Sequence, residues 1–413
     1  MTLTRMNFAV VRKVILTSLL IGVVFVSGYY LGVSGFRLES ASFPNVKIAR
    51  TIPKNHQDVD FALFWKVWDS IDASYYDKTK IDPGKMVYGA ISGLTASLGD
   101  PYTSFLPPEE NKLVEEDLSG SFQGVGIQIG FKGKNLAVIA PLPNSPAEVA
   151  GLKAGDLIVG IIDLEKKIEI GTSGINLNDA VKMIRGKAGT KVTLVLLRGE
   201  STESFKKEIT REAIDVPSIT VSYLDNNVAH IKLIKFGADT DTEWTKAVSE
   251  IINNQSPITN IVLDLRNNPG GYLQSSVDIA GEFVKKDSVV VIEDRGETNR
   301  IEYKTNRNGK FGNMKVVILV NGGSASASEI LAGALSEIKK CKLVGEKTFG
   351  KGTIQEPLQL DKGSSLHITI AKWLTPNGNW IHEKGLTPDV EIKDNEETLE
   401  VDEQLIEALK LLK

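Results

Sequence analysis

An uncharged run of twenty residues, Val14–Val33, dominates the start of the chain and follows Arg5, Arg12 and Lys13. Twenty helical residues cover the roughly 30 Å hydrocarbon core of a bilayer. We therefore expect residues 1–36 to be a transmembrane anchor, with the basic flank in the cytoplasm and the remainder on the exported side, in a periplasm or at the cell surface. A cleaved signal peptide would export the remainder equally well, and a buried helix of a soluble protein is the third alternative.

The pattern changes twice after the anchor. Residues 37–57 are polar and contain two prolines, which predicts a linker. From residue 58 to residue 118 apolar positions recur every three or four residues, which predicts helices. The aromatic residues at this spacing are Phe61, Phe64, Trp65 and Trp68. Such a stripe usually faces a core, and the alternative is a surface that packs against a second subunit.

A separate unit is expected at residues 119–212, where Gly124 and Gly126 bracket a stretch that then alternates like a strand. Strands are predicted at Asn135–Pro141 and Lys191–Leu197, and a helix at Leu177–Arg185. The unit opens with a glycine-containing loop at residues 124–127. A loop of this kind can turn its backbone N–H groups outward as a site for a carboxylate. By itself it is equally well a turn that starts a strand.

Strands followed by helices recur over residues 213–393, which predicts a parallel sheet with helical crossovers. The expected elements are strands at Ile258–Leu265, Met314–Val320 and Leu343–Val344, and helices at Tyr272–Val284 and from Ser326 onward. Residues 394–413 begin with an acidic tail and continue into a helical pattern at Val401–Leu412. We expect that helix to pack on the domain or to bind a partner.

Composition narrows the classes of protein. The 413 residues are enough for about two to four domains. The net charge is −4 and no basic stripe stands out, which argues against a nucleic-acid partner. The single cysteine, Cys341, allows no internal disulfide and no cysteine-based metal site, and we expect it to be a buried apolar residue. No metal or organic cofactor is indicated.

A serine-rich segment follows the strand expected at Met314–Val320. Residues 321–329 read N-G-G-S-A-S-A-S-E and open a helix. A serine hydroxyl there lies near exposed backbone N–H groups, which stabilise a developing oxyanion. The segment is not the G-x-S-x-G elbow, because Ser324 and Ser328 stand where the glycines around Ser326 would be. Alone, small residues at a helix start are more often a cap.

A serine nucleophile also needs a base. None of the four histidines, His56, His230, His367 and His382, lies in an obvious catalytic context. A lysine can serve instead when burial lowers its pKa enough to keep it neutral. Lys351, between Gly350 and Gly352, is the candidate, although a lysine beside glycines is more often a solvated turn.

Three motifs in order resemble a PDZ domain of the bacterial protease type. They are G-V-G-I at residues 124–127, S-P-A-E-x-A-G-L-K-A-G-D-x-I from Ser145 and D-A-V-K-x-I-R-G from Asp179. PDZ domains bind the C-terminal residues of a peptide as an added strand, with its carboxylate on the loop amides. The residues implied are Gly124, Val125, Gly126 and Ile127 for the carboxylate loop and Val181 and Ile184 for the side-chain pocket. Arg185 is the candidate for coupling peptide binding to catalysis, and otherwise a solvated cation at a helix end.

The wider pattern, over about residues 58–392, is similar to the carboxy-terminal processing peptidases, or tail-specific proteases. The motifs are G-D-P-Y-T-x-F at 99–105, D-L-R-x-N-x-G-G at 264–271, S-A-S-A-S-E at 324–329 and V-G-E-x-T-F-G-K-G-T-x-Q at 344–355. The resemblance implies a multidomain α+β and α/β chain. It comprises an N-terminal helical segment, a PDZ domain and a crotonase- or Clp-protease-like ββα catalytic domain. The implied enzyme is a serine peptidase without a cofactor.

The resemblance also implies site residues. They are Ser326 as nucleophile, Lys351 as general base, Gln355 to position the lysine, and the Ala327 and Gly271 amides as oxyanion hole. Glu329 and Arg266 are expected to be buried near each other and to support the site.

The implied substrates are exported proteins with accessible apolar C-terminal tails. We expect at least a dimer, since the aromatic helices and the C-terminal helix both carry apolar stripes. Two other classes remain open: a PDZ adaptor that binds without cutting, and acyl-CoA chemistry on a crotonase-like fold. The combination of Ser326, Lys351 and Gln355 argues against the adaptor, and the PDZ insertion together with the Ser–Lys pair argues against acyl-CoA chemistry.

Overall fold

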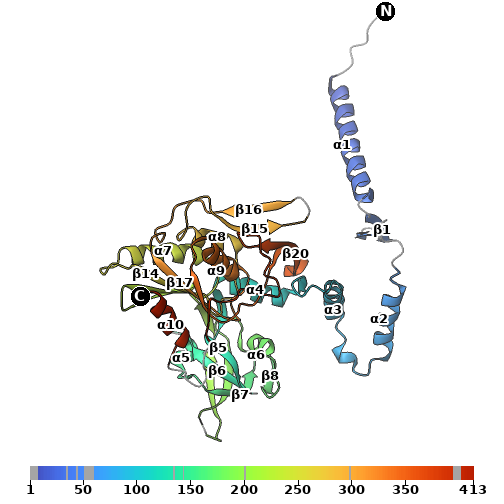
Figure 1. Ribbon diagram of the computed structural model, residues 1–413. Helices are drawn as coiled ribbons and strands as arrows, with labels where there is room; N and C mark the ends of the chain where they lie inside the picture. Colours follow the sequence, from blue (N-terminus) through green and yellow to red (C-terminus); the bar gives the residue numbers. More distant parts are fainter. Residues whose placement is uncertain are drawn as a thin grey trace, which may run out of the picture. The chain divides into compact units, whose positions relative to one another are not determined.

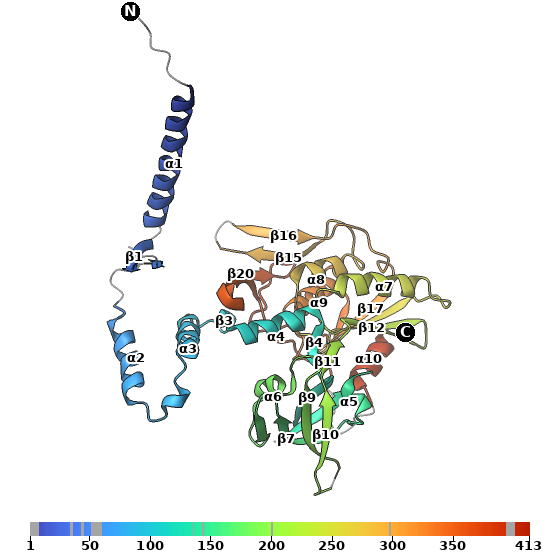
Figure 2. The same ribbon diagram turned by 180° about the vertical axis from the view of Figure 1, so that it is seen from behind.

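The computed structural model describes residues 8–33, 36–42, 45–50, 60–133, 135–142, 144–199, 201–296, 299–393 and 401–413. They belong to two compact units, Met1–Val87 and Tyr88–Lys413. Figures 1 and 2 label the elements from opposite sides.

The first unit begins with helix α1, Phe8–Val33, which contains a 19-residue span that is long and apolar enough to cross a membrane. Strand β1, Phe36–Ser42, then pairs antiparallel with β2, Asn45–Arg50. Part of the segment expected to be a linker, residues 37–57, therefore forms a two-stranded hairpin. The backbone register pairs Leu38 with Ile48. Residues 51–57 lie outside the described residues.

Helix α2, Ala62–Ser74, and helix α3, Pro83–Ala96, follow with a 3-10 turn, η2, at Lys78–Lys80. The aromatic stripe lies on and just before α2, as the spacing predicted, but it does not reach a core. Trp65 is 55% exposed, and no residue of α2 is buried. The rings contact one another instead, with the centroids of Phe64 and Trp65 5.1 Å apart. Packing against a second subunit stays a prediction.

The expected PDZ unit lies within Tyr88–Lys413 and is a sheet in the order β10-β9-β7-β6-β5, with β8 paired to β7. Its strands are β5 Ile127–Lys132, β6 Asn135–Pro141, β7 Leu157–Asp163, β8 Ile168–Gly171, β9 Lys191–Leu197 and β10 Phe205–Thr210. Its helices are α5 Pro146–Val149 and α6 Leu177–Ile184. The unit is flanked by α4, Pro108–Ser119, and by a ribbon of β4, Ser121–Gly124, and β11, Glu212–Asp215. Strands β6 and β9 have the bounds that the sequence predicted.

A six-stranded sheet in the order β12-β13-β14-β17-β18-β21 forms the centre of the last domain. Its strands are β12 Ile219–Leu224, β13 Val228–Leu233, β14 Asn260–Asp264, β17 Lys315–Val320, β18 Lys342–Gly345 and β21 Val390–Glu391. All neighbours from β13 onward pair in parallel, and only β12 is antiparallel. This confirms the parallel sheet that the strand and helix pattern predicted.

Helices cover both faces of this sheet. Helices α7 Thr240–Ile252, α8 Leu273–Ala280 and α9 Ala327–Ile338 share one core with Ile318 and Val320 of β17. Helix α10, Glu403–Leu411, shares the opposite core with Val317 and Leu319 of the same strand. The alternation of faces explains why β17 is a continuous apolar run. Cys341 is buried beside α9, as expected.

Helix α8 is shorter than expected. The N–H groups of Glu282 and Phe283 donate to the carbonyls three residues earlier, those of Ile279 and Ala280, so the chain tightens into a turn after α8. A second sheet, in the order β16-β15-β20-β19 with β3 on β20, completes the domain. Its strands are β3 Ser104–Leu106, β15 Val289–Asp294, β16 Arg300–Lys304, β19 Thr353–Gln359 and β20 Ser365–Leu374, and a 3-10 turn, η3, lies at Asp361–Gly363.

Candidate active site

Two loops meet at the carboxyl edge of the parallel sheet. β14 leads into residues 265–271 and β17 leads into residues 321–326. Hydrogen bonds join the two segments: Ser324 Oγ donates to the Leu265 carbonyl at 2.8 Å, and the Ala325 N–H and Ser328 Oγ donate to the Asn268 carbonyl at 3.0 and 2.7 Å. The serine-rich segment is therefore fixed against the D-L-R-x-N-x-G-G loop.

Ser326 is the residue immediately before helix α9, as the sequence predicted. Its backbone has φ 55° and ψ −116°, a conformation that a non-glycine residue rarely adopts. Such a strained position persists only where the surrounding contacts fix it, and functional sites are common places for it. Here the Ser326 N–H donates to Glu329 Oε2 at 2.9 Å.

Glu329 is completely buried and connects the serine segment to the lysine segment. One carboxylate oxygen, Oε2, accepts from both the Ser326 and the Lys351 N–H groups at 2.9 Å. The other, Oε1, accepts from Thr348 Oγ1 at 2.6 Å and from the Gly350 N–H at 2.7 Å. Four donors satisfy the buried charge, so its role is to hold these two segments of backbone together.

Lys351 enters this arrangement from the loop before β19. Burial lowers the pKa of its ammonium group, and the charges of Asp100 and Glu329 oppose that shift. Its Nζ lies 5.2 Å from the centre of the Tyr102 ring. Among the contacts of the described residues, no hydrogen bond joins Lys351 Nζ to Ser326 Oγ. The lysine is thus partly desolvated but turned toward Tyr102.

The glycines beside Lys351 are needed for close packing. A Cβ on Gly352 would lie 2.8 Å from the backbone nitrogen of His382, and Gly350 has φ +89°. The Gly352 N–H donates to His382 Nδ1 at 3.3 Å. The ring of His382 stacks on that of Trp380, with centroids 5.1 Å apart. The fourth histidine therefore lies beside the lysine loop and supports it.

Gln355 lies on β19 four residues after the lysine. Its Nε2 donates to Thr353 Oγ1 at 2.8 Å and to Thr369 Oγ1 at 3.3 Å. These bonds fix the plane of the amide. The structure places Gln355 on the same strand that Lys351 precedes, and among the described contacts none joins the two side chains.

Gly270 and Gly271, at the end of the loop that follows β14, pack tightly against Ser326 and Phe236, respectively. Gly271 has φ +136°, and a Cβ there would lie 2.0 Å from the Phe236 carbonyl oxygen. Gly270 has φ +97°, and a Cβ there would lie 2.8 Å from Ser326 Cβ and 2.9 Å from the Ala327 nitrogen. Both positions therefore require glycine. Because Ala327 is the first residue of α9, its N–H has no acceptor within the helix.

The PDZ-type groove is a separate cavity of about 150 Å³ between the glycine loop and helix α6. Its lining residues are Phe122, Val125, Gly126, Ile127, Ile129, Leu177, Val181, Ile184 and Arg185. Five of the six residues proposed from sequence meet there, and Gly124 precedes them on β4. Phe122, Ile129 and Leu177 also line this groove, although the sequence motifs did not predict them there.

Arg185 is not a solvated helix-end cation. Its guanidinium lies 4.3 Å above the Phe122 ring and donates to Asp117 Oδ1 at 2.8 Å. Glu116 lies 3.7 Å away on the same helix, α4. Phe122 also lines a second cavity, of about 310 Å³, that reaches Gly270 beside Ser326. Arg185 thus lines the first cavity and contacts Glu116, Asp117 and Phe122, which line the second.

Two family models match the chain. The model of peptidase family S41 matches residues 227–392, and the model of a PDZ domain matches residues 138–198. The chain is 37% identical over 343 residues to the carboxy-terminal processing protease CtpA of Bacillus subtilis strain 168, covering 81% of this chain and 69% of that protein. It is 34% identical over 390 residues to CtpB of the same strain, covering 93% of this chain and 78% of that protein.

The chain belongs to the carboxy-terminal processing proteases of peptidase family S41. It is therefore a serine peptidase. A solved structure, the photosystem II D1 C-terminal processing protease, is similar with a TM-score of 0.51 and 29% identity, over 80% of this chain and 92% of that chain. The family and the fold class inferred from the sequence are both confirmed.

Arg266 and Glu329, which the sequence predicted to be buried near each other, have separate hydrogen-bond partners in this processing protease. Arg266 donates to Asp264, Asp402 and Gln404, while Glu329 accepts from the serine and lysine segments. Asp264 is two residues before Arg266, whereas Asp402 is at the start of a C-terminal helix for which the sequence predicted no particular contact. The sequence pattern therefore did not indicate that Arg266 contacts Asp402.

Proposed function

We propose that this processing protease cuts proteins with Ser326 as nucleophile and Lys351 as general base. The observation that carries the proposal is the shared oxygen of Glu329, which holds the backbone of both residues. The Lys351 ammonium is desolvated by burial, and this lowers its pKa toward the range in which it is neutral and able to accept a proton.

In the first half-reaction neutral Lys351 Nζ takes the proton from Ser326 Oγ as the oxygen attacks the scissile carbonyl carbon. The Ala327 and Gly271 N–H groups then stabilise the oxyanion of the tetrahedral intermediate. Lys351 passes its proton to the leaving amine, and an acyl-enzyme ester remains on Ser326. A water molecule, deprotonated by Lys351, hydrolyses that ester.

This cycle requires the Lys351 side chain to turn from the Tyr102 ring toward Ser326. Gln355, whose amide plane is fixed by two threonine hydroxyls, is suited to orient the lysine in that position. Glu329 keeps the lysine loop in place during the change because its contacts are to backbone N–H groups.

The PDZ groove supports recognition of an apolar C-terminal tail. Val181 and Ile184 give it an apolar wall, and the loop of Gly124, Val125, Gly126 and Ile127 offers backbone N–H groups to a carboxylate. Arg185 lines this groove and contacts Asp117 and Phe122, which line the cavity at Gly270, and it is the proposed link from tail binding to catalysis.

The proposed location is the exported side of the cytoplasmic membrane. Helix α1 is long enough to span a bilayer and follows basic residues, which supports a single-pass anchor or an export signal. The exposed aromatic residues of the first unit support a homo-oligomer. A monomeric mass in light scattering would count against the oligomer.

Cleavage of an unfolded protein substrate by the full chain in detergent tests the proposal. Wild type is expected to cut a substrate that ends in apolar residues faster than one that ends in charged residues. Ser326→Ala and Lys351→Ala are expected to be folded and inactive. Tail binding without any cleavage by the wild type would favour the PDZ adaptor, or a need for an activating partner.

A further inference from the structure

We propose that the C-terminal helix α10 is a positioning element for the oxyanion hole, which it holds through Arg266. The inference rests on the proposed roles of Ser326 and Gly271. Residues 402–413 lie beyond the region that matches the peptidase family, which ends at residue 392. Helix α10 therefore adds to the matched peptidase region a contact that reaches the loop before Gly271.

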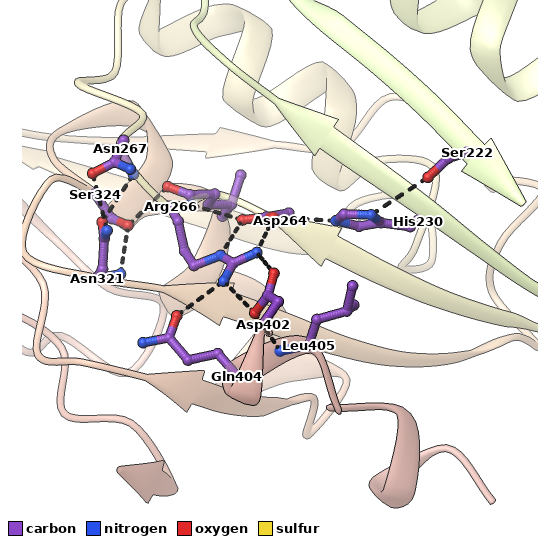
Figure 3. Close-up of polar contacts among 11 residues, drawn as sticks. Ser222, His230, Asp264, Arg266, Asn267, Asn321, Ser324, Asp402, Gln404 and Leu405 are labelled. Atoms are coloured by element: carbon purple, nitrogen blue, oxygen red, sulfur yellow. Dashed lines mark hydrogen bonds and ion pairs between the residues drawn. The ribbon is translucent and has the colours of Figure 1, made fainter. Parts of the chain in front are cut away.

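Arg266 forms a clasp between strand β14 and helix α10, as Figure 3 shows. Its Nε and Nη2 donate to the two carboxylate oxygens of Asp264 at 2.9 and 2.7 Å. Its Nη1 and Nη2 donate to the two carboxylate oxygens of Asp402, both at 2.8 Å. Nη1 also donates to Gln404 Oε1 at 3.1 Å. A planar guanidinium held on both edges by carboxylates has its orientation fixed.

Both ends of the clasp are anchored. Asp264 is fully buried and also contacts His230 Nε2 at 3.1 Å. On the other side Asp402 caps α10 by accepting from the Leu405 N–H at 2.8 Å, and the buried Gln404 donates to the Ile392 carbonyl at 2.8 Å. Arg266 thus joins two rigid parts of the domain.

Asn267, the residue after Arg266, extends the hydrogen-bonded contacts toward the segment that contains Ser326. Asn267 has φ 59°, and its N–H donates to Asn321 Oδ1 at 2.8 Å while Asn321 Nδ2 donates back to Asn267 Oδ1 at 3.0 Å. Asn321 is the first residue after β17, and its Oδ1 also accepts from the Gly323 N–H at 3.0 Å. Figure 3 shows this amide pair beside Ser324 and the clasp.

The same loop ends at the diglycine. Asn268 Oδ1 accepts from the Gly270 N–H at 2.9 Å, and Asn268 Nδ2 donates to the Leu233 carbonyl at 2.8 Å. The loop from Arg266 to Gly271 is therefore held at its start by α10 and along its length by neighbouring strands. Loosening the start is expected to displace the Gly271 N–H, and displacements of about 1 Å at a catalytic group reduce rates by up to roughly 10²-fold.

The test replaces residues of the clasp, Arg266 and Asp402, by substitutions that leave helix α10 folded. In Asp402→Asn the side chain still caps α10 but loses the charge on Arg266, because Asn is as good an N-cap as Asp. In Arg266→Lys the charge remains but the forked contact to two carboxylates is lost. The matched control is Glu407→Gln, which removes an exposed ion pair with Lys410 on the same helix.

Three quantities are measured on the full chain, well below its unfolding temperature. They are kcat and KM for a peptide substrate, the rate at which a fluorophosphonate labels Ser326, and hydrogen exchange of the amides of residues 266–272. Asp402→Asn and Arg266→Lys are expected to lower kcat and the labelling rate at least about tenfold with KM within about twofold. Removing one oxyanion donor costs about 10²–10³ in kcat. Exchange in 266–272 is expected to rise, and Glu407→Gln is expected to match wild type.

A fall in the unfolding temperature with kcat and labelling within twofold of wild type would overturn the inference, because it would show a purely structural role for α10. Faster exchange in α10 alone would overturn it too. A wild-type protein that neither cuts peptides nor labels at Ser326 would instead overturn the proposed function.

Discussion

Replacing Glu329 with glutamine should reveal how much the site depends on one buried carboxylate. In wild type the two oxygens accept four hydrogen bonds, from Ser326 and Lys351 on one side and from Thr348 and Gly350 on the other. Glutamine has the same shape but only one acceptor oxygen and an NH2 group. Two of the four donors must then face that NH2 group.

The geometry predicts which two donors face the NH2 group of the glutamine side chain in the Glu329→Gln variant. The Thr348 hydroxyl can rotate and accept from the new NH2 group, whereas the backbone N–H of Ser326 or Lys351 cannot. The NH2 group should therefore face Thr348 and Gly350, so that the Gly350 N–H loses its acceptor. One buried donor without an acceptor costs about 1–3 kcal/mol. Each of the two remaining hydrogen bonds, from the Ser326 and Lys351 N–H groups, weakens by about 1 kcal/mol when the charge of the carboxylate is lost. The free energy of unfolding of the catalytic domain should fall by about 3–5 kcal/mol.

The assay compares Glu329→Gln with Glu337→Gln. Glu337 lies at the other end of α9 and also holds a loop, accepting from Thr375 Oγ1 at 2.7 Å and from the Asn377 N–H at 2.8 Å. Urea unfolding followed by tryptophan fluorescence gives the stability change, and peptide cleavage at low denaturant gives kcat. Both variants should lose stability, but only Glu329→Gln should lose kcat, by at least about tenfold. A Glu329→Gln variant with wild-type kcat would refute the proposed link between the serine and lysine segments.

Three further substitutions test separate parts of the account. Asp100→Asn removes a charge that raises the pKa of Lys351 against the effect of burial, so the acidic limb of kcat/KM should move to lower pH. An unchanged or upward shift would contradict that assignment. Gly271→Ala should abolish cleavage, because its Cβ would meet a carbonyl oxygen at 2.0 Å; the control, Gly322→Ala, meets nothing closer than 4.0 Å and should stay active. Val181→Asp should weaken binding of an apolar-tailed peptide at least about tenfold in a fluorescence titration, and unchanged affinity would place the tail elsewhere.

The sequence predicted most of the elements that position the site. Strand β9 has the predicted bounds because buried positions alternate along it, and β6 has them because its apolar residues form one unbroken run from Leu136 to Ala140. β17 ends before Asn321, Gly322 and Gly323 because such residues are disfavoured in strands, and the helix that Ser326 precedes follows. The lysine loop after β18 could also be predicted from local sequence, because Gly350 and Gly352 permit a tight approach to neighbouring backbone.

Contacts between distant segments could not be predicted from local patterns. Arg266 and Asp402 are separated by 136 positions, and neither residue carries a signal that names its partner. Gly270 rather than Gly271 has its Cβ direction aimed at Ser326, a difference that depends on φ and not on residue type. The aromatic stripe of α2 shows the same limit, because its spacing predicts an apolar face but not what covers that face.

The most direct test of the Ser–Lys account is to label the full chain with a fluorophosphonate and to locate the adduct by mass spectrometry, in wild type and in Lys351→Ala. The account predicts a single adduct on Ser326 in wild type. It also predicts that the labelling rate falls to lower values as the pH drops and protonates the lysine, and that labelling is nearly absent in Lys351→Ala. An adduct on Ser324 or Ser328, or undiminished labelling of Ser326 in Lys351→Ala, would contradict it.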